Sequence, residues 1–395
     1  MAVSTVPLEL TYEILGHLHD DIRTLKTCAL VSRAWSEMGR GYLFHSLDLP
    51  FVLAKNNYDW ISLFLNIPAR LRDYVRRVSI KDADWSERGA IITCAVKALR
   101  HFSPKATILD ISDTAFPDFL DLVKILCAVK NLGSLSLHKV NWTTNSFEPT
   151  DIDACSLFIP QSLSALRVHY TDTSTLLGWI FAHPPTLIPK ITALYFGPSY
   201  CHLDPQITRY ICNYSESFVE LGMLLNPRKG TEEYAFYYRS PTIQDHRCDG
   251  NSLKKIKNGV EGWPCLRLSS RLRILRFHDF LNSSAAQESS PGPMFSTVVV
   301  PRALASMTEK FCGTLIFDVQ VHMVSQVDLS MVEWAALENV LSHEDYDNVK
   351  EIVFRTWTRI SLVGLENLIA RMMPRTYSRR ILKFERETSI PFNEL

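Results

Sequence analysis

The sequence lacks a net charge, paired cysteines and long apolar runs, and each absence excludes a class of protein. Lysine and arginine number 42 and aspartate and glutamate also 42, so the charge excess typical of nucleic-acid or membrane binders is missing. The nine cysteines form no CxxC pair, which excludes a dense disulfide framework. No apolar run approaches the roughly 18 residues of a spanning helix, and no signal-peptide pattern opens the chain. We therefore expect a soluble protein of the cytoplasm and/or nucleus that binds neither nucleic acid nor membrane.

The common catalytic signatures are also missing. The sequence contains no GxGxxG, GxxxxGK[ST], GxSxG or HExxH motif, so we expect no enzyme and no cofactor. His169 and His278 directly follow predicted strands. For both histidines we favour a hydrogen-bonded place on a polar rim over a role as general base. One group of residues contains possible metal ligands: Cys201, His202, Cys212, His246 and Cys248. Their spacing matches no zinc module, so we interpret them as buried thiols and surface histidines and expect no metal.

What the sequence does have is apolar content for a core of considerable size. The chain has 395 residues, of which 46% are hydrophobic and 21% charged. A chain of this length exceeds the size at which one core usually stops growing. We expect two modules or an elongated array.

The first fifty residues predict three helices. Pro7 suits the first turn of a helix that runs to Leu18 or His19. Its apolar residues form two neighbouring groups, which is wider than one core requires. The surplus apolar face predicts a protein partner.

Residues 5–49 resemble the F-box. The resemblance is carried by Pro7, Glu9, Leu10, Ile14, Leu18, the acidic turn Asp20–Asp21, Leu25, Cys28, Val31 and Trp35. The resemblance implies docking on the Skp-family adaptor of an SCF-type ubiquitin ligase. The adaptor-binding residues would be Val6, Pro7, Leu10, Ile14, Leu18, Leu25, Val31 and Trp35. For Trp35, packing inside the module and contact with the adaptor are both open.

Beyond residue 50 the pattern apolar-x-x-apolar-x-apolar recurs and predicts short strands. It occurs at 75–80, 106–111, 132–137, 163–168, 191–196, 218–223, 272–277, 312–317 and 349–354. Helix-like stretches such as 117–131 lie between these segments. Spacings near 26–31 residues between the first six segments match a leucine-rich-repeat period.

These patterns together predict an α+β fold, with an N-terminal three-helix F-box followed by an irregular leucine-rich-repeat-like α/β solenoid. The domain boundaries would be 5–49 for the F-box and 50–395 for the degenerate repeat region, with an insertion at about 226–270. The second region resembles that of many fungal F-box proteins.

A target-binding surface follows from the alternation of side chains along a strand. If the fourth and sixth residues of each segment face the core, the third and fifth face outward. Solvent exposure alone and target binding both explain the charges found there. The candidate target-binding residues are Arg77, Asp110, Arg167, Tyr195, Glu220 and Arg276.

A basic cluster lies near the end of the chain, between Arg371 and Arg386. Its cationic residues are Arg371, Arg375, Arg379, Arg380, Lys383 and Arg386. A solvated face, paired with Glu385 and Glu387, is favoured over a patch for nucleic acid or lipid.

The predicted function is therefore that of a substrate-receptor subunit of an SCF-type cullin-RING ubiquitin ligase. It would bind the Skp-family adaptor and, through it, the cullin scaffold, and present a protein target that the sequence does not identify. The alternative is an F-box scaffold or adaptor-complex protein without ligase function. An unrelated enzyme on a repeat fold is the third class, disfavoured by the missing catalytic motifs.

Overall fold

The structure is a computed structural model, and it describes most of the chain. The described residues are 7–18, 21–50, 67–83, 85, 89–102, 105–145, 157–197, 205–224, 271–282, 300–301, 303–305, 307, 310–320, 332–356, 358 and 360–387. The chain divides into unit 1, residues 1–165 and 179–189, and unit 2, residues 166–178 and 190–395. The predicted insertion at 226–270 lies outside the described residues.

Unit 1 begins with helices α1 (Leu8–His17), α2 (Ile22–Cys28) and α3 (Arg33–Leu43). Asp21 caps α2 by accepting a hydrogen bond from the Thr24 amide, and Ser32 caps α3 in the same way for Trp35. Leu15, Leu25 and Met38, one from each helix, are buried against one another. The three helices thus share a small core.

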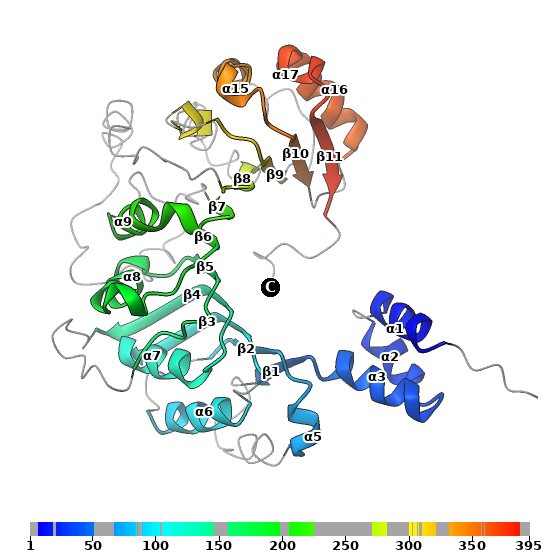
Figure 1. Ribbon diagram of the computed structural model, residues 1–395, viewed down its shortest axis with the longest axis vertical. Helices are drawn as coiled ribbons and strands as arrows, with labels where there is room; N and C mark the ends of the chain where they lie inside the picture. The colour runs from blue at the N-terminus through cyan, green and yellow to red at the C-terminus, as the bar shows by residue number, and fades with distance from the viewer. Residues whose placement is uncertain are drawn as a thin grey trace, which may run out of the picture. The chain divides into compact units, whose positions relative to one another are not determined.

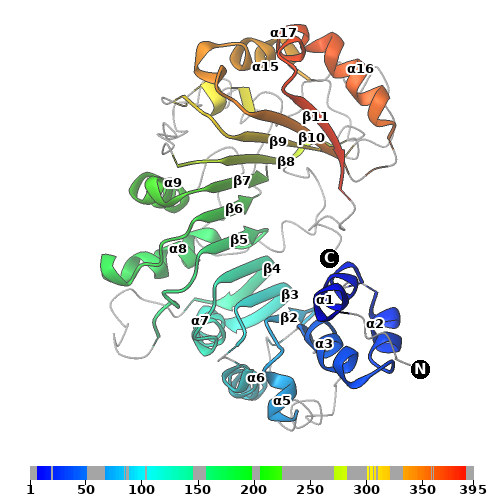
Figure 2. The same ribbon diagram turned by 45° about the vertical axis from the view of Figure 1, so that its right-hand side comes forward.

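The remainder of unit 1 is built on parallel strands (Figure 1). β1 (Ser46–Pro50), β2 (Arg77–Lys81), β3 (Ile108–Asp118) and β4 (Ser134–Thr144) pair in chain order. Between them run α5 (Ala69–Arg72), α6 (Gly89–Phe102) and α7 (Phe119–Ala128). Figures 1 and 2 both show α6 and α7 on one side of β2–β4. The helix predicted within 117–131 is confirmed as α7, and its apolar residues Phe119, Leu122, Val123 and Leu126 are all buried.

Unit 2 repeats this arrangement of parallel strands and helices. β6 (Ala193–Gly197), β7 (Glu220–Leu224), β8 (Ile274–Asn282), β9 (Thr314–Gln320), β10 (Glu351–Thr356) and β11 (Leu382–Arg386) pair in parallel. β5 (Ala165–His169) and α8 (Thr173–Ala182) each span a boundary between the units. The remaining elements are the 3-10 helices η1 (Pro185–Leu187), η2 (Ser215–Ser217) and η4 (Glu344–Tyr346), and the α-helices α9 (Pro205–Tyr214), α15 (Trp334–Leu341), α16 (Leu362–Met372) and α17 (Pro374–Ser378).

The predicted strands are confirmed, and so is the burial of their fourth and sixth residues. The sixth residues of the last three segments, Phe277, Phe317 and Phe354, stack at centroid distances of 5.4 and 5.2 Å. Phe384 of β11 continues the stack at 5.7 Å from Phe354. Parallel pairing in register places these rings side by side, so the ladder follows from the strand alignment.

The predicted fold class is wrong. The eleven described strands form one sheet in chain order, and every strand pair whose register is described is parallel, which is an α/β fold rather than a leucine-rich-repeat solenoid. Several fifth-position residues, predicted to face outward, are buried: Tyr195 is 4%, Ile316 6% and Val353 2% exposed. Burial on both faces is typical of parallel strands. Short apolar segments occur in both kinds of fold, so the pattern did not distinguish them.

The N-terminal part of the same prediction is also corrected. Residues 5–49 do not form a separate three-helix F-box, because Ser46–Pro50 is β1, the first strand of the sheet. Leu47 and Leu49 are the apolar residues of this strand, and they pair with Val78 and Ile80 of β2. The change from helical to alternating spacing after Leu43 is the local signal for this strand.

Candidate functional site

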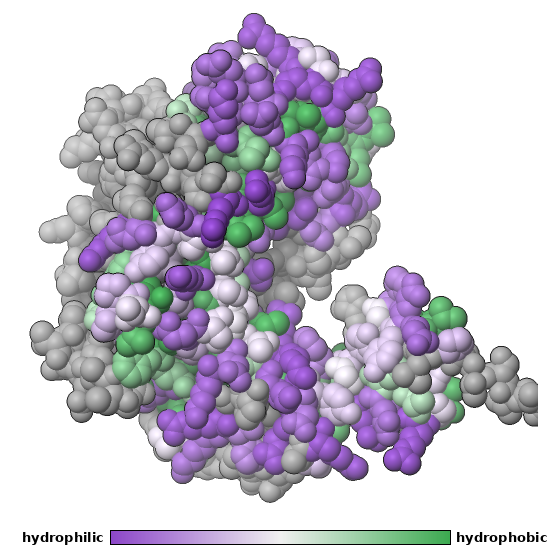
Figure 3. Space-filling view, in the orientation of Figure 1, coloured by the Kyte–Doolittle hydropathy of each residue, from purple (hydrophilic) through white to green (hydrophobic). Residues whose placement is uncertain are grey.

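The N-terminal helices carry an apolar surface, defined here as Leu10, Ile14 and Val31. These side chains are 50%, 43% and 66% exposed. Leu10 and Ile14 lie one helical turn apart on α1, so they share a face. Hydrophobic residues at the surface of these helices are green in Figure 3. Val31 lies in the turn after α2, and exposed apolar side chains such as these are typical of protein interaction sites.

The other predicted adaptor-binding residues have different environments. Pro7 is exposed, whereas Leu18 and Trp35 are partly buried against the cluster of Leu15, Leu25 and Met38. Leu25 is fully buried, so it supports the helices and is not part of their surface. For Trp35, packing within the module is confirmed and adaptor contact stays a prediction. Val6 lies outside the described residues.

The structure adds three exposed apolar residues that the sequence analysis did not assign to the adaptor. Tyr12 is 51%, Ile22 58% and Leu30 87% exposed. Tyr12 lies two residues from both Leu10 and Ile14, which places it on another side of α1. Leu30 directly precedes Val31 in the turn after α2, and the adjacent apolar pair was the available sequence signal.

The predicted target-binding residues fall in both units. In unit 1, Arg77 of β2 forms an ion pair with Asp110 of β3. In unit 2, Arg167, Tyr195, Glu220 and Arg276 lie on β5, β6, β7 and β8. Each set is held by contacts between different strands of its own unit.

Tyr195 is the centre of the cluster in unit 2. The Arg167 guanidinium lies 5.0 Å from the centroid of the Tyr195 ring, a cation–π arrangement. Burial, followed by the hydrogen bond to Glu220, raises the pKa of the Tyr195 hydroxyl. Tyr195 is buried and supports the Arg167 side chain through its ring.

Gly222 of β7 makes room for this ring. A Cβ at position 222 would lie 2.0 Å from Cδ1 of Tyr195, which is too close for any side chain. The ring therefore lies directly over the glycine backbone, and the absence of a side chain there is a packing requirement. The sequence analysis missed Gly222, although a glycine inside a predicted strand is a signal of close approach.

Asp318 of β9 forms a buried charged group with two residues of β8. Its Oδ2 lies 2.9 Å from Arg276 Nε and 2.8 Å from His278 Nδ1, and its side chain is completely buried. Burial raises the Asp318 pKa, but His278 and Arg276 outweigh that effect and leave the pKa below its usual range. Burial lowers the His278 pKa, and Arg276 and Arg167 lower it further against the opposing charge of Asp318.

The surroundings of His278 are aromatic. The ring centroids of His169 and Tyr195 lie 5.9 and 5.7 Å from that of His278. His278 Nδ1 lies 2.8 Å from Asp318, and its side chain is only 16% exposed; the polar-rim interpretation of the sequence stays a prediction. The sequence analysis missed Asp318, because its partner residues are about forty positions away in the chain.

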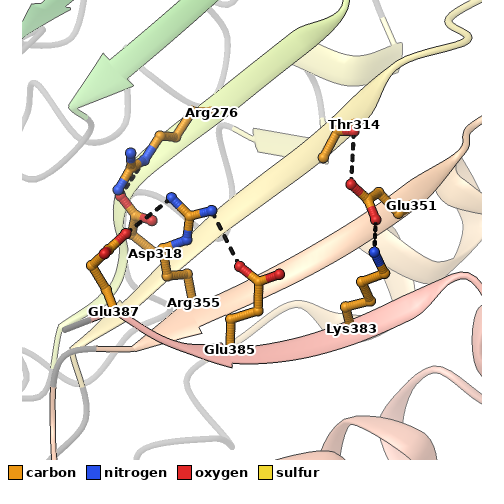
Figure 4. A network of polar contacts seen from close by, with 8 residues as sticks. All are labelled: Arg276, Thr314, Asp318, Glu351, Arg355, Lys383, Glu385 and Glu387. Atoms are coloured by element: carbon orange, nitrogen blue, oxygen red, sulfur yellow. Dashed lines mark hydrogen bonds and ion pairs between the residues drawn. The ribbon is translucent and has the colours of Figure 1, made fainter. Parts of the chain in front are cut away.

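A network of ion pairs continues across β8–β11 (Figure 4). Arg355 contacts Glu385 at 3.2 Å and Glu387 at 3.3 Å, and Glu351 pairs with Lys383. Glu351 also accepts a hydrogen bond from the Thr314 hydroxyl. Cations and anions alternate from strand to strand, so this part of the sheet satisfies its own charges.

The possible metal ligands are mostly outside the described residues. Cys201, His202, His246 and Cys248 lie there, and the side chain of Cys212 in α9 is not described. Among the described residues, no group of three or more His, Cys, Asp or Glu side chains could hold a metal ion. No helix within that same part of the chain is long and apolar enough to cross a membrane.

No model of a protein family matches the chain, and no curated protein matches it either.

Proposed function

We propose that the protein is a substrate-receptor subunit of an SCF-type cullin-RING ubiquitin ligase, working in the cytoplasm and/or nucleus. Its N-terminal helices would bind a Skp-family adaptor, which connects it to the cullin, and its sheet would present a protein target. The role is one of binding and not of catalysis. The proposal combines the sequence resemblance of residues 5–49 with one structural observation, the exposure of the apolar surface.

That observation carries the proposal for a physical reason. Leu15, Leu25 and Met38 already fill the interior of the N-terminal helices, so Leu10, Ile14 and Val31 are not needed there. Burying one apolar side chain of this size is worth ~1.5–3 kcal/mol. A partner that covers all three would gain enough free energy for stable binding.

The first prediction tests the adaptor contact. Leu10→Ala with Ile14→Ala should weaken binding of the Skp-family adaptor by about a hundredfold or more, because two central apolar anchors are lost. A pull-down of the adaptor with each protein, followed by titration calorimetry, measures the change.

The matched control replaces exposed apolar residues elsewhere. Val219→Ala with Val363→Ala removes side chains that are 42% and 66% exposed in unit 2, and adaptor recovery should stay at the wild-type level. Equal recovery of adaptor by the α1 variant and the wild type would contradict the proposal.

The alternative function is a scaffold in an adaptor complex without ligase activity. The exposed apolar surface suits both roles, since each requires the same adaptor contact. Co-purification of a cullin with the full chain, together with ubiquitin transfer to a bound protein, distinguishes the receptor from the scaffold.

A further inference from the structure

The cationic residues near the end of the described chain divide into two groups. Three of them stabilise the fold, since Arg379 donates to the carbonyl oxygens of Leu341 and Tyr346, Arg386 to that of Ile360, and Lys383 pairs with Glu351. The others, Arg371, Arg375 and Arg380, are exposed. Within the part of the chain that the structure describes, their guanidinium groups form no ion pair. The predicted pairing of this segment with Glu385 and Glu387 is wrong, because both carboxylates form their ion pairs with Arg355.

The backbone of α17, which carries Arg375 and precedes Arg380, is anchored to α15. Helix α17 has five residues and would be marginal alone. The buried carboxylate of Glu338 on α15 accepts hydrogen bonds from the amides of Arg375, at 2.6 Å, and Thr376, at 3.2 Å. Arg379 binds the carbonyl oxygen of Leu341 at the end of α15. Both ends of α17 are thereby attached to α15, and the helix is preorganised.

Exposed apolar residues accompany the arginines. Met372 is 36% and Tyr377 40% exposed. The Tyr377 hydroxyl donates to Glu366 at 3.2 Å, which restrains the ring. Arginine, tyrosine and methionine are the residue types enriched in protein interfaces. We call Arg371, Met372, Arg375, Tyr377 and Arg380 the arginine surface.

We propose that the arginine surface binds an acidic segment of a partner protein. Guanidinium groups bind carboxylates through paired hydrogen bonds, so exposed arginines on and beside the anchored helix α17, with no ion pair among the described residues, suit aspartate and glutamate side chains. Preorganisation lowers the entropic cost of binding. If the proposed receptor function holds, this partner is the ubiquitination target. The binding of an acidic segment itself is inferred from the arginine surface and does not depend on that function.

Nucleic acid and anionic membrane fit this surface less well. Both usually require more cationic contacts than three, and the chain as a whole has no net charge to attract a polyanion. The apolar and aromatic members of the surface also favour a peptide.

The experiment measures binding of a fluorescein-labelled oligoglutamate peptide to the full chain by fluorescence anisotropy. The charge-reversed variant Arg371→Glu, Arg375→Glu and Arg380→Glu should bind the peptide about tenfold more weakly or worse, because attraction becomes repulsion. Binding by the wild type should also weaken as salt rises. Circular dichroism checks that the variant is folded.

The matched control reverses three exposed cations of unit 1, namely Lys97→Glu, Arg100→Glu and Lys105→Glu. This variant has the same change in net charge and should bind the peptide as the wild type does. Equal losses in both variants would overturn the proposal, as would peptide binding that the arginine reversals leave unchanged. Tighter binding of a single-stranded oligonucleotide, or of vesicles containing phosphatidylserine, would overturn it in favour of those partners. Adaptor recovery is measured in a separate experiment. A failure to bind the adaptor would therefore contradict the receptor proposal without affecting the test of the arginine surface.

Discussion

At the scale of single residues, Gly222 illustrates how one position controls a cluster. A Cβ there would overlap the Tyr195 ring, so Gly222→Ala should displace the ring from beneath Arg167. We expect a loss of about 1–3 kcal/mol in the free energy of unfolding, the usual cost of overpacking. Urea denaturation measures it, and the loss should shrink in a Tyr195→Ala background.

Gly178→Ala is the control for this prediction. Gly178 lies in α8 with nothing within 4 Å of an added Cβ, so alanine there should raise stability by about 0.5–1 kcal/mol. A Gly222→Ala protein as stable as the wild type would show that Tyr195 does not depend on the glycine.

At the scale of elements, Glu338 connects α15 to α17. The Glu338 carboxylate accepts from the Arg375 and Thr376 amides and from the Thr376 hydroxyl. Glu338→Gln keeps the size of the side chain but replaces one carboxylate oxygen with an NH₂ group, so one of these donors loses its acceptor. We expect a loss of about 1–3 kcal/mol. Hydrogen exchange of the Arg375 and Thr376 amides should accelerate. Glu333→Gln, at the exposed N-cap of α15, should leave both amides protected. Unchanged exchange in the Glu338 variant would contradict the role of its carboxylate.

At the scale of the whole molecule, we expect the partly buried His278 to make stability depend on pH. Burial and the neighbouring arginines lower its pKa below the ordinary 6.5, so the unfolded chain binds the proton more readily. The contribution of uncharged His278 to the free energy of unfolding is fully present above about pH 6.5 and is lost as the pH falls below that value. His278→Asn still donates to Asp318 but does not titrate, so its Tm should fall less than that of the wild type between about pH 7 and 5. Parallel Tm curves would contradict this assignment.

The sequence by itself determined the positions of β2 to β10 and the burial of the fourth and sixth residues of their segments. The fourth and sixth residues, such as Leu315 and Phe317 of β9, follow from alternation within one short segment, because successive side chains of a strand point to opposite faces. The exposed apolar residues of α1 followed in the same way from helical spacing.

Only the tertiary structure decided how these segments combine. The α/β fold could not be derived, because short apolar strands look the same in a solenoid and in a parallel sheet. The contacts of the site depend on register between distant strands: Arg276 meets Asp318 across 42 positions of the chain, and Glu338 meets Thr376 across 38. Side-chain periodicity reports local geometry only, whereas these contacts depend on which strands and helices become neighbours.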